Sequence, residues 1–72
     1  MKILSKMIIE ALRETYPVGT RVVLQRMDDP QAPPIGTKGS VYGVDDLGNI
    51  LVQWDNGSSL NIVYGVDLCR KE

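Results

Sequence analysis

Hydrophobic positions near the start of the chain recur with the spacing of one face of an α-helix. Apolar residues occupy positions 4, 7, 8, 11 and 12, and Pro17 ends the run. This spacing predicts an amphipathic helix over residues 3–16. The apolar arc is wide because Ile9 and Tyr16 extend it at its margins. Such an arc is explained either by a helix that covers a small barrel with its whole width or by a margin that contacts a second protein.

Beyond Pro17 the pattern changes to short apolar segments with a period of two, separated by glycine, proline, aspartate and asparagine. We predict strands over residues 20–27, 38–44, 50–54 and 59–64, followed by a helical turn and a short closing strand within residues 65–69. Because successive side chains of a strand alternate between its faces, Val22 and Leu24 are expected to point inward on the first strand. For the same reason Ile50, Val52 and Trp54 are expected to share the inner face of the third strand.

Glycine and proline positions indicate how the predicted strands are bent and connected. Gly39 and Gly43 lie inside the second strand, where they predict a bulge or a strong bend. Asn56-Gly57 predicts a type I′ turn that makes the third and fourth strands antiparallel neighbours. The segment 28–36 contains three prolines and is expected to be a stiff extended loop. Together these features predict a mainly β fold, a small five-stranded barrel with an N-terminal amphipathic α-helix.

Composition limits the functions that this fold could carry. A length of 72 residues suits one domain, with the helix at 3–16 and the barrel at 19–70. The 8 basic and 9 acidic residues give a net charge of −1, which provides no general attraction for nucleic acid. With no histidine and one cysteine, the chain offers no catalytic imidazole, thiolate metal site or internal disulfide. We therefore expect a cytoplasmic protein that is not an enzyme, binds no cofactor and has neither a signal peptide nor a membrane span.

Several short motifs resemble those of SH3-like barrels of the KOW and Tudor type, namely Gly36-Thr37-Lys38-Gly39-Ser40-Val41, Val44-Asp45-Asp46 and Val52-Gln53-Trp54-Asp55-Asn56-Gly57. Over almost its whole length, including Pro17-x-Gly19-Thr20-Arg21 and Tyr64-Gly65-Val66-Asp67, the chain also resembles a family of short uncharacterised proteins from bacteriophages and mobile elements of Gram-positive bacteria. The resemblance implies an SH3-like barrel and an accessory role in a bacterial cytoplasm, and it transfers no catalytic residue. Unlike KOW domains, the chain lacks a basic face.

Our leading hypothesis is a phage or mobile-element accessory or inhibitor protein that binds a host or element protein. Charge is unevenly distributed along the chain: residues 1–27 carry five positive and two negative charges, whereas residues 28–67 carry one positive and six negative charges. Such polarity can steer partners of complementary charge. The candidate contact residues are Ile9, Tyr16, Pro33, Pro34, Ile35, Asp45 and Asp46. The alternative explanation for the aspartates is that they form turns.

Two further hypotheses use other surfaces. A nucleic-acid or nucleotide binder would use the face formed by Arg21, Arg26, Lys38 and Tyr42. A homodimer would bury Ile9 and its helical neighbours against a second copy. Trp54 is expected to be a core residue rather than a stacking platform, and Cys69 a small buried apolar side chain rather than a nucleophile.

Overall fold

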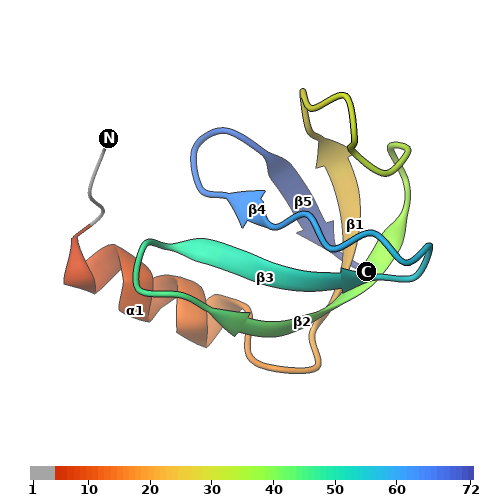
Figure 1. Ribbon diagram of the computed structural model, residues 1–72. Helices are drawn as coiled ribbons and strands as arrows, with labels where there is room; N and C mark the ends of the chain where they lie inside the picture. Colours follow the sequence, from red (N-terminus) through yellow and green to blue (C-terminus); the bar gives the residue numbers. More distant parts are fainter. Residues whose placement is uncertain (1–4) are drawn as a thin grey trace.

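The computed structural model describes residues 5–72. In chain order the elements are α1 (Lys6–Thr15), β1 (Arg21–Arg26), β2 (Lys38–Val44), β3 (Asn49–Trp54), β4 (Ile62–Val63) and β5 (Leu68–Lys71). The strands form one antiparallel sheet, which curves around a single core while α1 runs beside the β2–β3 hairpin (Figure 1). The prediction of a mainly β fold with five strands and an N-terminal helix is confirmed.

The helix begins later than the periodicity predicts. Ser5 has an extended backbone, and its Oγ accepts a hydrogen bond from the N–H of Ile8 at 3.3 Å. Serine in this geometry is an N-cap because it satisfies an N–H group of the first turn that has no partner within the helix. The helix therefore starts at Lys6, and the predicted positions 3 and 4 lie outside the described residues. Tyr16 caps the other end, directly before Pro17.

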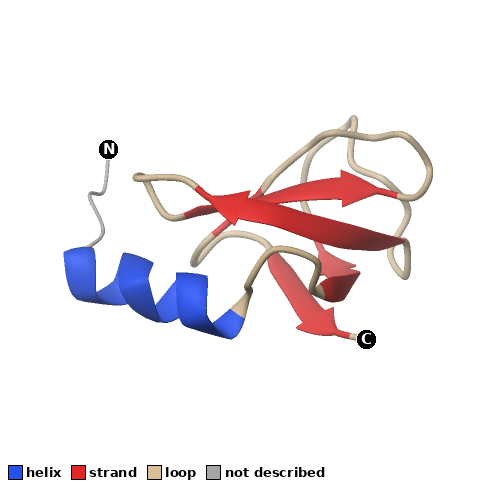
Figure 2. Cartoon of the chain, turned by 90° about the horizontal axis from the view of Figure 1, so that it is seen from below, coloured by secondary structure: helices blue, strands red, loops and turns tan. Residues whose placement is uncertain are grey.

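The sheet has the strand order β4-β3-β2-β1-β5, so β4 and β5 are its two edges (Figure 1). Seen from below, the helix lies to one side of the strands (Figure 2). The pairing of β2 with β3 shifts register between Val41 and Gly43, which confirms the predicted bulge. A second shift occurs between β1 and β5, between Leu24 and Arg26. Bulges bend a strand and increase its twist, and these two shifts help the sheet curl until β4 and β5 approach each other without forming a ladder.

The core lies inside this curve. Its buried members are Leu12, Val22, Leu24, Val41, Ile50, Val52, Trp54 and Ile62. The inward faces predicted for the first and third strands are confirmed, and Leu12 shows that the helix packs on its own sheet. Trp54 is 1% exposed, and its Nε1–H donates to the carbonyl of Leu60 at 2.7 Å. Burial of the indole therefore leaves no unpaired donor.

Two local predictions are wrong. The 54–58 hairpin is not a type I′ turn, because no residue other than glycine has a positive φ among residues 5–72, and Gly57 adopts φ 90°. The N–H of Gly57 donates to the carbonyl of Trp54, and the N–H of Trp54 donates to the carbonyl of Ser58. This is a three-residue loop with the left-handed position at glycine.

The fourth strand, predicted over 59–64, is only Ile62–Val63, although it does pair antiparallel with β3.

The segment between β4 and β5 folds back on β4. The carbonyl of Val63 accepts hydrogen bonds from the N–H groups of Val66 and Asp67, and the N–H of Val63 donates to Asp67 Oδ2 at 2.9 Å. This turn uses the outward backbone groups of Val63, so β4 ends there.

Within residues 5–72, α1 has too few residues and too little hydropathy to cross a lipid bilayer.

Candidate functional site

A groove of about 280 Å³ opens where the two edge strands approach each other. Buried residues of α1, β3 and β4 form its floor: Leu12, Ile50 and Ile62. Its walls are Tyr16, Tyr64, Leu68 and Cys69, with Gly65 and Asp67 at one end. We call this the seam groove. Four separate parts of the chain build it, so it exists only in the folded protein.

The walls of the seam groove leave apolar surface in contact with solvent. Tyr64 is 47% exposed and Leu68 is 51% exposed. Tyr16 and Cys69 are half-buried and pack against the core. Burial raises the pKa of the Cys69 thiol, and it also raises the pKa of the neighbouring Tyr16 hydroxyl. Both groups are therefore neutral at pH 7, and the interior of the groove is apolar and uncharged apart from Asp67.

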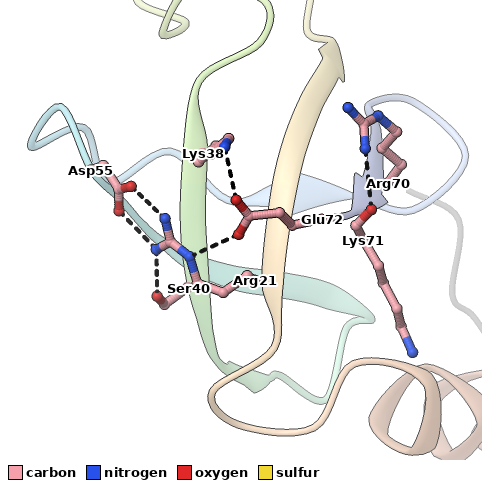
Figure 3. A network of polar contacts seen from close by, with 7 residues as sticks. All are labelled: Arg21, Lys38, Ser40, Asp55, Arg70, Lys71 and Glu72. Carbon is pink, nitrogen blue, oxygen red and sulfur yellow. Dashed lines mark hydrogen bonds and ion pairs between the residues drawn. The ribbon is translucent and has the colours of Figure 1, made fainter.

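The last strand, β5, carries two cations, of which Lys71 lies beside Tyr16 of the seam groove. Lys71 Nζ lies 5.8 Å from the centre of the Tyr16 ring, which is a cation–π distance. Arg70 Nη1 donates to the carbonyl of Lys71 at 3.3 Å (Figure 3). Among the described residues, neither cation forms an ion pair with a carboxylate. Asp67 carries the groove's negative charge, and the N–H of Val63 already donates to it.

A second hollow, of about 380 Å³, lies on the other side of Asp67. It is bounded by Asp28 and Asp29 as well as Asp67, and by the apolar side chains of Met27, Leu60, Val63 and Val66. Asn61 Oδ1 is buried here without a hydrogen-bond partner in the described part of the chain. No group of acidic or thiol side chains among residues 5–72 has the arrangement of a metal site. This hollow therefore presents carboxylates and one unpartnered amide oxygen, but no set of metal ligands among the described residues.

The outer face of the sheet carries a network of four charges (Figure 3). Arg21 donates to both carboxylate oxygens of Asp55, with Nη1–Oδ1 at 2.9 Å, and also donates to Ser40 Oγ and Glu72. Lys38 Nζ lies 2.8 Å from the other oxygen of Glu72. The charges of the two cations and the two carboxylates therefore sum to zero. Arg21 holds the pKa of Asp55 below its usual value, and Lys38, followed by Arg21, does the same for Glu72.

This network predicts a pH dependence of stability. A carboxyl group whose folded pKa is lowered stabilises the fold above its unfolded pKa, about 4 for aspartate, and loses this contribution as pH falls through the folded value. The difference in unfolding free energy between the natural protein and Asp55→Asn should therefore be largest near pH 7 and shrink below about pH 4. Urea unfolding at several pH values measures it. Added salt should reduce the difference at pH 7, and an unchanged difference at pH 3 would contradict the assignment.

The structure disperses the predicted partner-contact residues. Ile9 is 8% exposed, and Pro33 is also buried, so both lack the surface that a partner contact requires. Ile9 is buried because α1 packs closely on its own sheet, which also removes it as the centre of a dimer contact. Pro34 and Ile35 are exposed on the proline loop, far in sequence from the seam groove. Of the whole predicted set, Tyr16 alone lines the groove.

The aspartates are divided between turns and ion pairs. Asp45 accepts hydrogen bonds from the N–H groups of Leu47 and Asn49 at 3.0 and 2.9 Å. Although partial burial opposes it, these bonds and one from the Asn49 side chain lower the pKa of Asp45. Asp46 forms an exposed ion pair with Arg13 at 2.9 Å, which joins the hairpin to α1. The turn explanation therefore accounts for Asp45 better than partner contact does.

The predicted nucleic-acid face is largely neutralised. Arg21 and Lys38 belong to the four-charge network, and Arg26 forms an exposed ion pair with Asp28 at 3.5 Å. Tyr42 is 53% exposed at the β2 bulge. These four residues therefore offer an aromatic ring and no unpaired cation.

Sequence reasoning missed Tyr64 and Leu68 as site residues. The sequence pattern places Tyr64 in a strand and Leu68 in a closing segment, and the resemblance at Tyr64-Gly65-Val66-Asp67 implies no binding role for either residue. The last ten residues combine large apolar residues with Gly65 and two cations. This combination indicates a binding site only when the fold shows that Tyr16 lines the same groove as Tyr64 and Leu68.

Comparison with known families matches residues 5–72 to a domain of unknown function, DUF4314. The chain belongs to the DUF4314 family. The match covers nearly all of the chain, including every element that lines the seam groove. Among curated proteins, no sequence matches the chain significantly. The function of this DUF4314 domain must therefore be inferred from its surface.

Proposed function

We propose that this protein is a non-catalytic interaction module that binds an extended segment of another protein in the seam groove. The observation that carries the proposal is the half-exposed pair Tyr64 and Leu68 above a buried apolar floor. Protein interfaces are organised around a few aromatic and apolar anchors of this kind, within a polar rim. Lys71, beside Tyr16, provides part of such a rim.

The strand order and the short motifs support the further proposal that the sheet is an SH3-like barrel. The resemblance to phage and mobile-element proteins supports a setting inside a bacterial host cell. In that setting the partner is a host or element protein. The seam groove replaces the surface predicted from sequence, because Ile9 and Pro33 are buried whereas Tyr64 and Leu68 are accessible.

Selection from a library of random displayed peptides tests this function. Peptides enriched on the natural protein should bind the double variant Tyr64→Ser/Leu68→Ser at least about tenfold more weakly, since each anchor contributes on the order of 1 kcal/mol or more. The matched control is Ile35→Ser/Leu47→Ser, which removes two comparably exposed apolar side chains outside the groove.

Circular dichroism melts of both double variants show whether each remains folded. Equal binding by the natural protein and the groove variant would contradict the proposal. Loss of binding in the control variant instead would assign recognition to the proline loop or the β2–β3 turn. A library that yields no specific peptide would also count against a segment-binding function.

A further inference from the structure

We infer that the free edge of β5 takes up the partner segment as an additional β-strand, and that this segment is acidic. The inference rests on the proposed function, because the same segment would place an apolar side chain in the seam groove. Beyond the proposed function, the inference specifies the backbone geometry with which the partner segment binds and the charge of that segment. Strand addition at an exposed sheet edge is a general mode of peptide recognition, in which the main chain supplies affinity and side-chain pockets supply selectivity.

The hydrogen bonds of β1 show which groups of β5 are unpaired. The N–H of Leu24 donates to the carbonyl of Thr37, and the N–H of Val41 donates to the carbonyl of Thr20, so the even-numbered residues of β1 pair with β2. The backbone N–H and C=O groups of its odd-numbered residues therefore point toward β5. In agreement, the N–H of Glu72 donates to the carbonyl of Arg21.

Because Val23 lies opposite Arg70, Arg70 and Glu72 point their backbone groups toward β1. In an antiparallel ladder the intervening residues point the other way. The N–H and C=O groups of Cys69 and Lys71 therefore face away from β1, toward the seam between β5 and β4, where no ladder is formed. The one described bond there is the donation from Arg70 Nη1 to the Lys71 carbonyl, made by a side chain that a partner can displace.

At the other sheet edge, β4, the outward backbone groups of Val63 are already hydrogen-bonded. At β4 the turn 63–67 already satisfies both backbone groups of Val63, with Asp67 Oδ2 accepting from its N–H. The two edges thus differ: the chain closes β4 with its own turn and leaves β5 open. An open edge is otherwise an aggregation hazard that proteins reduce by charge, and Arg70 and Lys71 stand at this position.

Charge selects the partner. Arg70 and Lys71 have no carboxylate partner within residues 5–72, whereas Arg21 and Lys38 on the same sheet are paired. A segment with glutamate or aspartate opposite Arg70 and Lys71, and an apolar side chain opposite Tyr16 and Leu68, complements this edge. Two unpaired cations next to Glu72 are too few for strong binding to a nucleic-acid backbone, which depends on several phosphate contacts.

Defined peptides test the inference by fluorescence anisotropy. Each labelled eight-residue probe has three β-branched apolar residues and two glutamates, placed at the amino end for antiparallel pairing or at the carboxyl end for parallel pairing. Matched probes carry lysine in place of glutamate, or N-methyl groups on alternate backbone amides. We expect one glutamate probe to bind at least about tenfold more tightly than its lysine and N-methylated counterparts, with the charge preference lost in Arg70→Gln/Lys71→Gln.

The outcomes separate this inference from the proposed function. If the N-methylated probe binds as well as its parent, or if charge has no effect while library peptides still require Tyr64 and Leu68, strand addition of an acidic segment is overturned and the groove function stands. If neither library peptides nor the probes need these groove residues, both are overturned. Binding of a single-stranded oligonucleotide through Arg70 and Lys71, with no binding of the acidic probes, would also overturn the inference.

Discussion

Replacing Trp54 with alanine is expected to leave the protein largely unfolded at 25 °C. Trp54 is the largest fully buried side chain, and it lies among the apolar residues of four strands. Removal of a buried tryptophan costs about 3–5 kcal/mol through lost transfer free energy and the cavity left behind. Small domains lie near the lower end of the usual stability range of about 5–15 kcal/mol. Circular dichroism during urea titration measures the loss.

Trp54→Phe is the matched control. It keeps an aromatic ring in the core but removes the Nε1–H that donates to the Leu60 carbonyl. Loss of a hydrogen bond to this partly buried acceptor costs about 1 kcal/mol, so the variant should be destabilised yet remain cooperative. An unfolding midpoint for Trp54→Ala close to that of the natural protein would contradict the assignment of Trp54 to the centre of the core.

The second large effect is expected for Gly39→Ala. A Cβ atom at position 39 would lie 2.6 Å from Val52 Cγ1, 2.8 Å from Trp54 Cε3 and 2.9 Å from the Gln53 carbonyl oxygen. Real Cβ atoms do not approach other atoms so closely, and one of these neighbours is backbone. Overpacking of this kind costs about 1–3 kcal/mol and occasionally more. We expect a value near the top of that range from urea unfolding.

Gly43→Ala tests whether the effect is specific to position 39. Gly43 lies in the same strand, but a Cβ atom there would be 3.6 Å from Leu51 Cδ1, an ordinary contact. The variant should therefore unfold within about 1 kcal/mol of the natural protein. Equal destabilisation by the two substitutions would show that the requirement is for strand flexibility in general and not for close approach of β2 to β3.

Much of the sheet could be predicted from the sequence because its signals are local. The residues of β2 were predicted with both bounds, and the inward alternation of Val22 with Leu24 and of Val52 with Trp54 follows from a period of two. The bulge near Gly43 follows from glycine inside a strand. These features depend on residues close together in the chain, where side-chain direction and backbone freedom decide the conformation.

The remaining features depend on contacts between distant segments. β4 ends at Val63 because Asp67 and its turn bind the backbone of Val63, which no alternation of residue types reveals. The helical wheel places Ile9 at an outer margin, because it shows the width of the apolar arc but not how much of that arc the sheet covers. The seam groove joins Tyr16 to Leu68, so its exposure depends on how the two edge strands meet.

Amide hydrogen exchange, followed residue by residue by NMR, tests the central claim that the edge of β5 is an open binding site. In the free protein the Arg70 amide should be protected by β1, while the Cys69 and Lys71 amides should exchange rapidly. Saturation with the preferred acidic probe should protect Cys69 and Lys71 and leave Arg70 unchanged. Exchange at Cys69 and Lys71 that stays rapid when the probe is bound, or that is already slow in the free protein, would contradict the account.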